Sequence, residues 1–238
     1  MSKPFRFKKF TVHQDRCAMK VGTDGVLLGA WVSLAFNPNS ILDIGAGTGI
    51  IALQMAQRSN ATTIDAVELD NDAFEQCTEN FEVSPWNDRL FCYHASIQEF
   101  ASEMDCRYDL IVSNPPFHSE ATKTRNVSRD RARFTESLPF LHLVVCAHTL
   151  LTDCGRFGVI MPTAAAQEFE SLAHEKHLHL IRVCEVRGTP QSTSKRVLME
   201  FSKTPSTTPI KETLIIETAR HAYTPEYREL VQDFYLKL

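Results

Sequence analysis

The chain has 238 residues, of which 43% are hydrophobic and 23% are charged, and its formal net charge is −4. This composition is that of an ordinary globular protein and excludes a disordered or fibrous chain. The longest uncharged run, residues 25–42, contains the polar stretch 37–40 and so cannot cross a membrane as an apolar helix. The first ten residues mix basic and aromatic side chains and lack the apolar run of a secretory signal, so we expect a cytoplasmic protein with one α/β core.

The seven cysteines are odd in number, widely scattered and never spaced as Cys-x-x-Cys. This pattern favours reduced thiols over a disulfide framework and provides no zinc site. We therefore expect neither a structural disulfide nor a bound metal, and we expect the protein to act as a monomer.

Segments typical of strands and helices alternate along the chain. Residues 5–12 alternate apolar and polar side chains, as in a short strand or hairpin arm. A helix is expected next, through Trp31, with Thr23 or Asp24 as its cap. After it we expect strands at 40–44, 62–68, 90–94, 108–113, 155–161, 178–187 and 195–202, and helices at 50–58, 72–83, 139–151 and 163–177.

This alternation predicts an α/β fold with a mostly parallel sheet and helices on both faces. The last two of the seven expected strands have no helix between them, which predicts one antiparallel strand at an edge of the sheet. We divide the chain into an N-terminal extension (1–36), a core (37–203) and a C-terminal extension (204–238). In the last part we expect a strand at 214–216 and a helix at 225–237.

A glycine-rich turn, residues 45–49, joins the first buried strand to the helix after it. Glycines allow a sharp bend and a close approach of the backbone to a ligand. Glu68 follows Gly49 by nineteen residues and ends the next strand, where its carboxylate can accept hydrogen bonds from both hydroxyls of a ribose. The combination predicts a nucleoside site, whereas the glycines alone would fit a simple tight turn.

The residues around this turn distinguish between cofactors. A dinucleotide site would have its third glycine at position 50, which is Ile50, and Asp43 would repel a pyrophosphate. S-adenosylmethionine has no phosphate, and Asp43 would attract its ammonium and sulfonium groups. We therefore predict S-adenosylmethionine as the cofactor.

The motif Asn114-Pro115-Pro116-Phe117 directly follows the apolar strand at 108–113. The amino nitrogen of adenine or guanine is a poor nucleophile because its lone pair is delocalised into the ring. The side-chain oxygen of Asn114 and the carbonyl of Pro115 could accept hydrogen bonds from the two amino protons and so restore that lone pair. The prolines would fix the backbone, and Phe117 would stack on the base, although the same residues could simply end a strand.

The two motifs together resemble the class I, Rossmann-like methyltransferases, in the subgroup that methylates amino groups of adenine, guanine or glutamine. The opening of the chain, residues 7–31, is similar to that of the bacterial tRNA methyltransferases that form N6-methyladenine beside the anticodon of valine tRNA. Residues 67–70 and 114–118 fit the same family. The resemblance covers most of the chain and implies a Rossmann-like seven-stranded sheet, an S-adenosylmethionine cofactor and a tRNA substrate.

The resemblance also implies roles for the residues at matching positions. Lys20, Thr23 and Asp24 would close over the methionine end of the cofactor, although a helix cap also explains the last two. Ser96 and Ile97 would flank the adenine of the cofactor. The implied catalytic residues are Asn114, Pro115, Pro116 and Phe117, and the implied cofactor-binding residues are Lys20, Thr23, Asp24, Asp43, Gly45, Ala46, Gly47, Gly49, Glu68, Leu69, Ser96, Ile97 and Asn114.

An RNA substrate needs contacts to its phosphates, and a basic segment directly follows the Asn-Pro-Pro-Phe motif. A solvated charged surface would have the same composition. The basic residues near the N-terminus form a second candidate, and His118 could orient the substrate. The residues that we expect to contact RNA are Lys8, Lys9, His118, Lys123, Arg125, Arg129, Arg131 and Arg133.

Other functions fit parts of the same pattern. RNA guanine-N2 methyltransferases also resemble the Asn-Pro-Pro-Phe-His motif at residues 114–118. Protein glutamine methyltransferases more often have tyrosine in place of Phe117. A module that binds the cofactor or RNA without catalysis would not need both Asn114 and Glu68. Methylation of cytosine C5 is disfavoured because it needs a nucleophilic cysteine near the motif, and none is present there.

Overall fold

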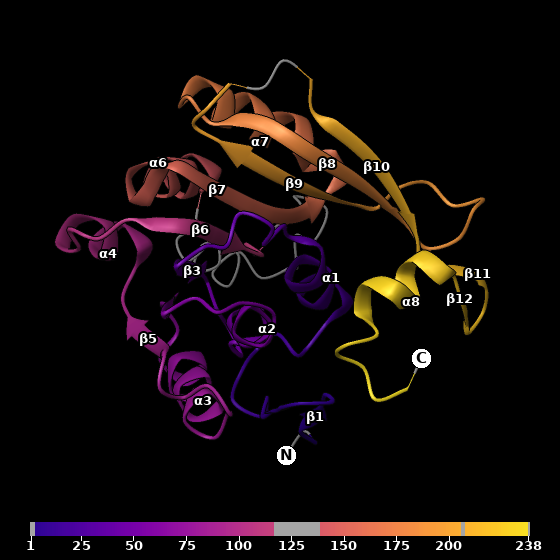
Figure 1. Ribbon diagram of the computed structural model, residues 1–238, viewed down its shortest axis with the longest axis horizontal. Coiled ribbons are helices and arrows are strands. Elements are labelled where there is room, and N and C mark those ends of the chain that lie inside the picture. The colour runs from indigo at the N-terminus through magenta and orange to yellow at the C-terminus, as the bar shows by residue number, and fades with distance from the viewer. Residues whose placement is uncertain (1–2, 117–138, 206–207, 238) are drawn as a thin grey trace, which may run out of the picture.

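The computed structural model describes residues 3–116, 139–205 and 208–237, which form an α/β fold around one eight-stranded sheet (Figure 1). The strand order is β10-β8-β9-β7-β6-β3-β4-β5. Every neighbouring pair is parallel except the two pairs that β9 forms with β7 and β8. The strands are β3 (Ser40–Ile44), β4 (Thr63–Glu68), β5 (Leu90–His94), β6 (Tyr108–Ser113), β7 (Leu151–Pro162), β8 (His179–Arg187), β9 (Arg196–Ser202) and β10 (Ile210–Ile215).

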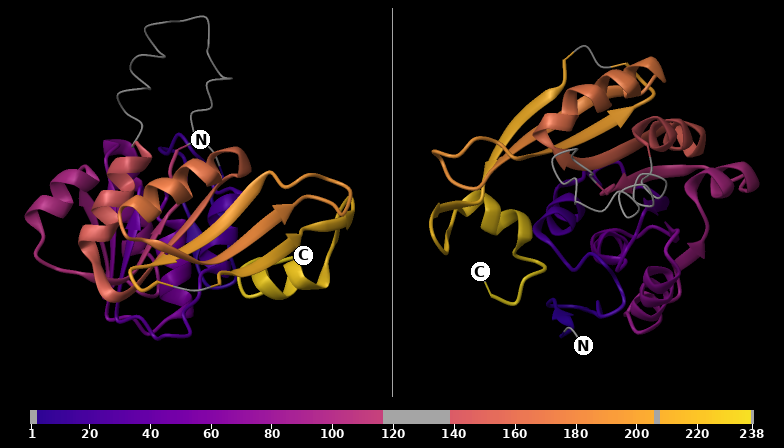
Figure 2. Two further views of the ribbon diagram at one scale, coloured as in Figure 1. Left: turned by 90° about the horizontal axis from the view of Figure 1, so that it is seen from above. Right: turned by 180° about the vertical axis from the view of Figure 1, so that it is seen from behind.

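Helices pack on both faces of this sheet, as the views in Figure 2 also show. One face carries α1 (Thr23–Trp31), α2 (Ile50–Arg58), α3 (Asn71–Glu82) and α8 (Pro225–Val231). The other face carries α4 (Ile97–Glu103), α6 (Phe140–Leu150) and α7 (Thr163–Glu175). Two short hairpins complete the described chain, β1 (Phe5–Arg6) with β2 (Thr11–Val12), and β11 (Glu217–Ala219) with β12 (Ala222–Tyr223).

The central strands are apolar on both faces because helices cover both. In β3, Ile41 packs in the core below α1 and α2, whereas Leu42 packs in the core below α4 and α6. The same alternation holds in β6, where Leu110 and Ile111 belong to different cores and are both fully buried. Continuous apolar runs of this kind are typical of parallel strands buried on both sides.

The expected Rossmann-like α/β fold is confirmed, but the sheet has eight strands rather than seven. The additional strand, β10, comes from the C-terminal extension and pairs in parallel with β8. Leu214 buries its side chain there, and Glu212 forms an ion pair with Arg182 at 3.0 Å. The antiparallel strand β9 is therefore inside the sheet, between β7 and β8, and the expectation of an antiparallel edge strand is wrong.

Two expected details of the helices differ in the structure. Helix α1 has the expected span, but its N-cap is Gly22, and neither Thr23 nor Asp24 caps it with a side chain. Helix α8 ends at Val231 rather than at Lys237. Within the described ranges, no helix is long and apolar enough to span a membrane.

The N-terminal hairpin is anchored by aromatic side chains. The rings of Phe7 and Phe10 stack with centroids 4.7 Å apart. Phe7 also packs against Tyr235, and Phe10 meets the edge of Trp86 at 5.9 Å. This cluster fastens the start of the chain to segments that follow α8 and α3.

A buried amide holds the segment after this hairpin. Asn80 on α3 is fully buried, and its Nδ2 donates to the carbonyl oxygens of His13 at 2.8 Å and Thr48 at 2.9 Å. Its Oδ1 accepts a hydrogen bond from the backbone nitrogen of His13 at 2.8 Å. Asn80 thus joins the N-terminal segment to the glycine turn that contains Thr48.

We expect Asn80→Asp to destabilise the protein although the two side chains have the same shape. The carboxylate has no N–H group, so it would face two carbonyl oxygens in a buried site, at a cost of about 3 kcal/mol or more. Urea unfolding measures the loss, and hydrogen exchange should become faster around His13. Asn87→Asp, at an exposed position, is the matched control and should change stability by less than about 0.5 kcal/mol. Equal losses of stability for both variants would contradict the role of the buried Asn80 amide in joining the two segments.

Candidate functional site

The glycine turn between β3 and α2 uses backbone conformations that favour glycine. Gly45, Gly47 and Gly49 have φ values of 72°, 54° and 77°. A Cβ at Gly45 or Gly47 would meet no atom of the described residues within 4 Å, so these two glycines leave space for a ligand. A Cβ at Gly49 would lie 2.6 Å from Phe81 and 2.8 Å from Cys77. Gly49 therefore serves the packing of the turn against α3.

Glu68 ends β4 and points toward the glycine turn. Its Oε2 accepts a hydrogen bond from the backbone nitrogen of Gly47 at 2.7 Å. Its Oε1 accepts hydrogen bonds from the backbone nitrogens of Leu69 and Asp70, both at 2.9 Å. These three N–H groups hold the carboxylate beside the turn, and its expected contact with the ribose of the cofactor stays a prediction.

Asp43 lies beneath the turn and is 0% exposed. Its Oδ2 accepts a hydrogen bond from the backbone nitrogen of Ala52 at 3.1 Å, and its Oδ1 has no partner within the described chain. Burial raises the pKa of Asp43 to about 7, and the nearby charge of Glu68 adds to the shift. A buried carboxylate with one unpartnered oxygen suits a cationic ligand.

Asn114 lies beside the glycine turn because of the strand register. Ile44 at the end of β3 pairs with Val67 on β4 and with Ser113 on β6. The Oγ of Ser113 also donates to the carbonyl oxygen of Ile44 at 2.9 Å. The residues that directly follow these three positions are therefore together at one edge of the sheet, and they are Gly45, Glu68 and Asn114.

The rest of the Asn-Pro-Pro-Phe motif is only partly described. Pro115 is buried and Pro116 is exposed, directly after the end of β6. Phe117 lies outside the described residues, so its expected stacking on a base stays a prediction.

Lys20 belongs to a loop that folds beside Glu68. Its Nζ donates to the carbonyl oxygens of Gln14 and Cys17, the latter at 3.0 Å. Burial and the negative charge of Glu68 raise the pKa of the Cys17 thiol to about 11, so the loop lies within electrostatic reach of the Glu68 carboxylate. Thr23 is exposed at the start of α1. The loop therefore lies near Glu68, and the expected contacts of Lys20 and Thr23 with the cofactor stay predictions.

Asp24 makes a contact that the sequence does not suggest. Its Oδ2 pairs with Nε of Arg196, at the start of β9, at 2.7 Å. The two residues are 172 positions apart, and no local motif marks Arg196. Only the strand order of the sheet brings it to the edge where α1 begins.

The four remaining cofactor candidates have different environments. Ser96 is the N-cap of α4 and forms a reciprocal capping box with Glu99, and Ile97 is buried. Helix α4 was not expected, although the Ser-x-x-Glu pattern could have indicated it. Leu69 is 55% exposed beside Glu68, and Ala46 donates its backbone N–H to the end of β4.

Two of the expected RNA-contacting residues are described. Lys8 is exposed and donates through Nζ to the carbonyl oxygen of Gln232 at 2.6 Å. Lys9 is exposed on the same turn. The other expected contacts lie outside the described residues, and they are His118, Lys123, Arg125, Arg129, Arg131 and Arg133.

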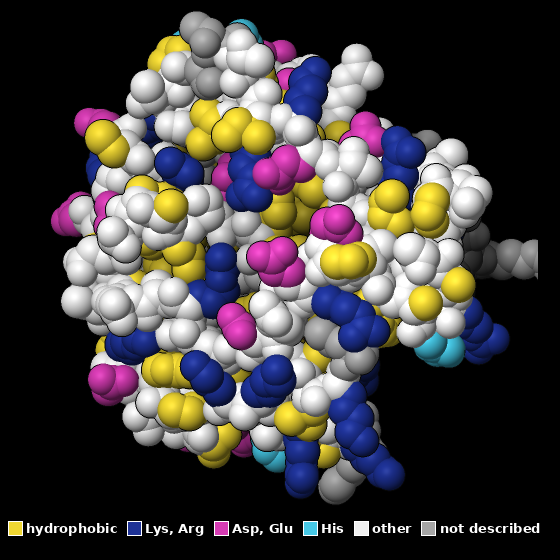
Figure 3. All heavy atoms as spheres, turned by 45° about the vertical axis from the view of Figure 1, so that its right-hand side comes forward, with side chains coloured by type: hydrophobic (Ala, Val, Ile, Leu, Met, Phe, Trp, Pro, Cys, Tyr) yellow, Lys and Arg dark blue, Asp and Glu magenta, His cyan; other side chains and the backbone are white. Residues whose placement is uncertain are grey.

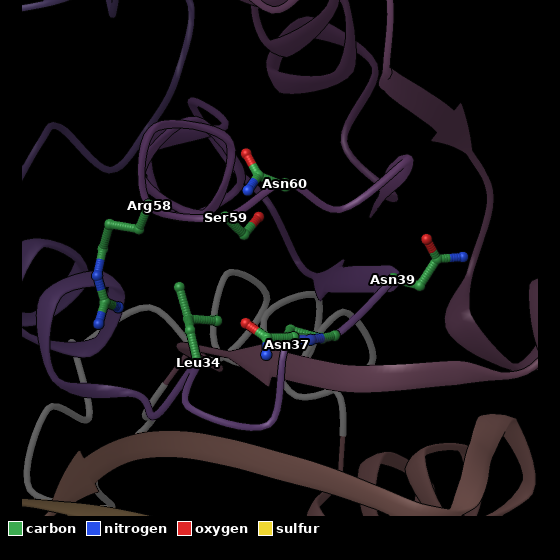
Figure 4. A pocket seen from close by; sticks show the side chains of 7 residues that line it. Leu34, Asn37, Asn39, Arg58, Ser59 and Asn60 are labelled. Carbon is green, nitrogen blue, oxygen red and sulfur yellow. The ribbon is translucent and has the colours of Figure 1, made fainter.

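Two surface depressions lie at the opposite edge of the sheet, where the parallel strands begin. The one in Figure 4 is lined by Leu34, Asn37, Pro38, Asn39, Arg58, Ser59 and Asn60. The other is lined by Arg107, His148, Thr149, Thr152, Asp153 and Lys203. Neither contains a residue of the candidate site. In the portion that the structure describes, no group of three His, Cys, Asp or Glu side chains could hold a metal ion.

Comparison with known proteins identifies the family. The methyltransferase small domain model matches residues 25–136. A tRNA1(Val) (adenine(37)-N6)-methyltransferase from Flavobacterium johnsoniae is 53% identical, over 98% of this chain and 100% of its own length. One from Christiangramia forsetii is 52% identical, over 100% of this chain and 99% of its own length. The chain belongs to this methyltransferase family.

A solved structure supports the fold of this methyltransferase independently. A predicted O-methyltransferase from Agrobacterium tumefaciens superposes with a TM-score of 0.70 at 19% identity. The match covers 89% of this chain and 96% of that one. It agrees with the class I architecture expected from the sequence.

We expect Gly49→Ala to destabilise this methyltransferase by about 2–4 kcal/mol. Alanine is strained at a φ of 77°, and its Cβ would collide with Phe81 and Cys77. Gly188→Ala is the matched control, because among the residues that the structure describes a Cβ there would meet only Ser192 Oγ, at 3.8 Å. Urea unfolding of both variants measures the difference, and similar midpoints would contradict the packing role of Gly49.

Proposed function

We propose that this protein transfers the methyl group of S-adenosylmethionine to the N6 amino group of adenine 37 in a valine tRNA. The names of its curated relatives describe this reaction. The observation that carries the proposal is the common edge of β3, β4 and β6, where Gly45, Glu68 and Asn114 come together. One ligand-binding region can therefore contact both the cofactor motif and the Asn-Pro-Pro motif.

Three features of the turn fit S-adenosylmethionine. Gly45 and Gly47 leave open space in front of their backbones, and Glu68 offers a carboxylate for the ribose hydroxyls. The unpartnered Oδ1 of Asp43 suits the ammonium of the methionine part. When bound, the cofactor supplies an electrophilic methyl group on its sulfonium.

Asn114 would act on the amino group of the target base. Its side-chain oxygen and the carbonyl of Pro115 would accept the two amino hydrogens and favour a pyramidal nitrogen with its lone pair directed at the methyl group. The hydrogen bond from Ser113 to Ile44 holds the strand end that carries Asn114. Since the methylated amine loses its proton readily, this scheme relies on positioning and needs no separate general base.

We expect Asn114→Ala to lower the rate constant of methyl transfer by at least about 100-fold, because the acceptor that activates the nitrogen is lost. The assay uses labelled cofactor and a valine tRNA that lacks the modification, followed by nucleoside analysis. Cofactor affinity should change by less than about threefold.

Asn60→Ala, an exposed change at the opposite edge, is the matched control and should retain full activity. If the wild-type protein formed N2-methylguanosine or labelled protein as its product, the proposed function would be contradicted. Full activity of Asn114→Ala would contradict the proposed mechanism.

We expect cofactor binding to weaken as the pH falls below about 7. Burial raises the pKa of Asp43 to about 7, and the cofactor ammonium would favour the carboxylate and lower that pKa in the complex. Binding then releases a proton at acidic pH, so the dissociation constant should rise by up to about tenfold for each pH unit below 7. Calorimetry between about pH 5.5 and 7.5 measures this trend.

Asp43→Asn is the control for this titration, because the amide has nearly the same size and no proton to release. Its dissociation constant should be higher and nearly constant across the same range. A wild-type dissociation constant that does not change with pH would exclude Asp43 as the titrating group.

The tRNA would contact the protein mainly through phosphates, whose binding does not require a positive net charge for the whole molecule. Figure 3 shows Lys and Arg side chains gathered over the lower part of one face, near the N-terminal hairpin that carries Lys8 and Lys9. These two residues stay our candidates for RNA contacts in the described chain. A tRNA substrate also agrees with the expected cytoplasmic location.

A further inference from the structure

Arg196 lies at the same edge of the sheet as Asn114, the candidate catalytic residue, and extends beyond it. β7 pairs with Ser113 through Val159 and then continues by three residues to Pro162, which pairs with Arg196. Asn114 directly follows Ser113, two strands away from Arg196. With strand spacings of about 4.8 Å and a rise of about 3.3 Å per residue, Arg196 lies roughly 10 Å to the side of Asn114 and about 7 Å further along the strand direction.

The position of the Arg196 guanidinium is fixed by Asp24. Nε donates to Asp24 Oδ2 at 2.7 Å, and Nη1 donates to the carbonyl oxygen of Lys195 at 3.1 Å. The backbone behind it is also tied down, because Ser194 Oγ donates to the carbonyl oxygen of Arg196 at 2.9 Å and bonds Thr163 Oγ1 at 3.1 Å. Holding a long side chain in place in advance lowers the entropy lost when a ligand binds.

Part of the Arg196 guanidinium is exposed and could bind a ligand. The Arg196 side chain is 37% exposed, and Nη2 makes no hydrogen bond within the described part of the chain. The neighbouring Lys195 is exposed and its ammonium has no partner there either. A planar guanidinium that is held rigidly matches the geometry of a phosphate group, and Lys195 adds a second positive charge at the adjacent residue.

We infer that Arg196, assisted by Lys195, binds a backbone phosphate next to the target nucleotide and so positions the base over Asn114. The inference rests on the proposed function and extends it to substrate binding. A base that leaves its stack to reach Asn114 must be held by its flanking backbone, and phosphate contacts supply that positioning. The distance from Asn114 is one that a nucleotide and its phosphate can bridge.

The methionine carboxylate of the cofactor is the competing ligand for Arg196. Asp24 lies near the glycine turn, since a Cβ at the next residue, Gly25, would lie 3.2 Å from Ile50 on α2. A contact to the cofactor would make Arg196 determine cofactor affinity. A contact to RNA would make it determine RNA affinity and the dependence of that affinity on salt.

The test compares Arg196→Gln, Arg196→Lys and Asp24→Asn in steady-state methylation of the valine tRNA and in equilibrium binding of the same tRNA at several salt concentrations. For Arg196→Gln we expect the tRNA KM and dissociation constant to rise about tenfold and the cofactor dissociation constant to stay within about twofold. The salt dependence of tRNA binding should become shallower by about 0.7 per lost phosphate contact. Arg196→Lys should restore the salt dependence but not the full affinity.

Asp24→Asn separates this role from a structural one, because it breaks the ion pair but keeps the cation. It should therefore retain the wild-type salt dependence. If Arg196→Gln does not fold, Lys195→Gln at an exposed and unpaired position should show a smaller change in the same direction. Lys176→Gln, an exposed change at the opposite edge of the sheet, is the control and should behave as wild type.

An unchanged tRNA affinity in Arg196→Gln, or an equal loss of cofactor affinity, would overturn the inference. An equal loss of salt dependence in Asp24→Asn would also overturn it. A wild-type protein that methylates no tRNA would contradict the proposed function instead, and the binding measurements would still decide the role of Arg196.

Discussion

The parallel pairing of β4, β3 and β6 is the constraint on which the candidate site depends. It aligns three strand ends that come from distant parts of the sequence, so that a glycine turn, a carboxylate and an amide share one edge. A slip of one residue in either pairing would turn every side chain of that strand to the opposite face. The apolar residues of β3 and β6 oppose such a slip, since each must face its own core.

The two carboxylates at this edge have different electrostatic roles. Glu68 accepts three backbone N–H groups, so both of its oxygens have hydrogen-bond partners without a ligand. Asp43 has one such partner, and its burial together with the charge of Glu68 raises its pKa to about 7. The buried residue is therefore the one whose charge would gain most from a cation, whereas Glu68 suits neutral hydroxyl groups.

Sequence patterns predicted the strands and helices of the core except α4, because apolar periodicity and glycine or proline boundaries are local signals. The grouping of Gly45, Glu68 and Asn114 was also predictable, since the ends of parallel strands meet at one edge. The contact of Asp24 with Arg196 was not, because it depends on an antiparallel strand inserted between two others. The strand β10 was expected only as part of an extension, since pairing with β8 depends on tertiary contacts such as that of Glu212 with Arg182.

The buried amide of Asn80 has a consequence for how the molecule responds to its ligand. Because one side chain bonds both His13 and Thr48, the ordering of the N-terminal segment and that of the glycine turn are not independent. Any free energy that a ligand contributes to ordering the turn is shared with the residues around His13, and the reverse also holds. The start of the chain is in this sense coupled to the candidate cofactor site.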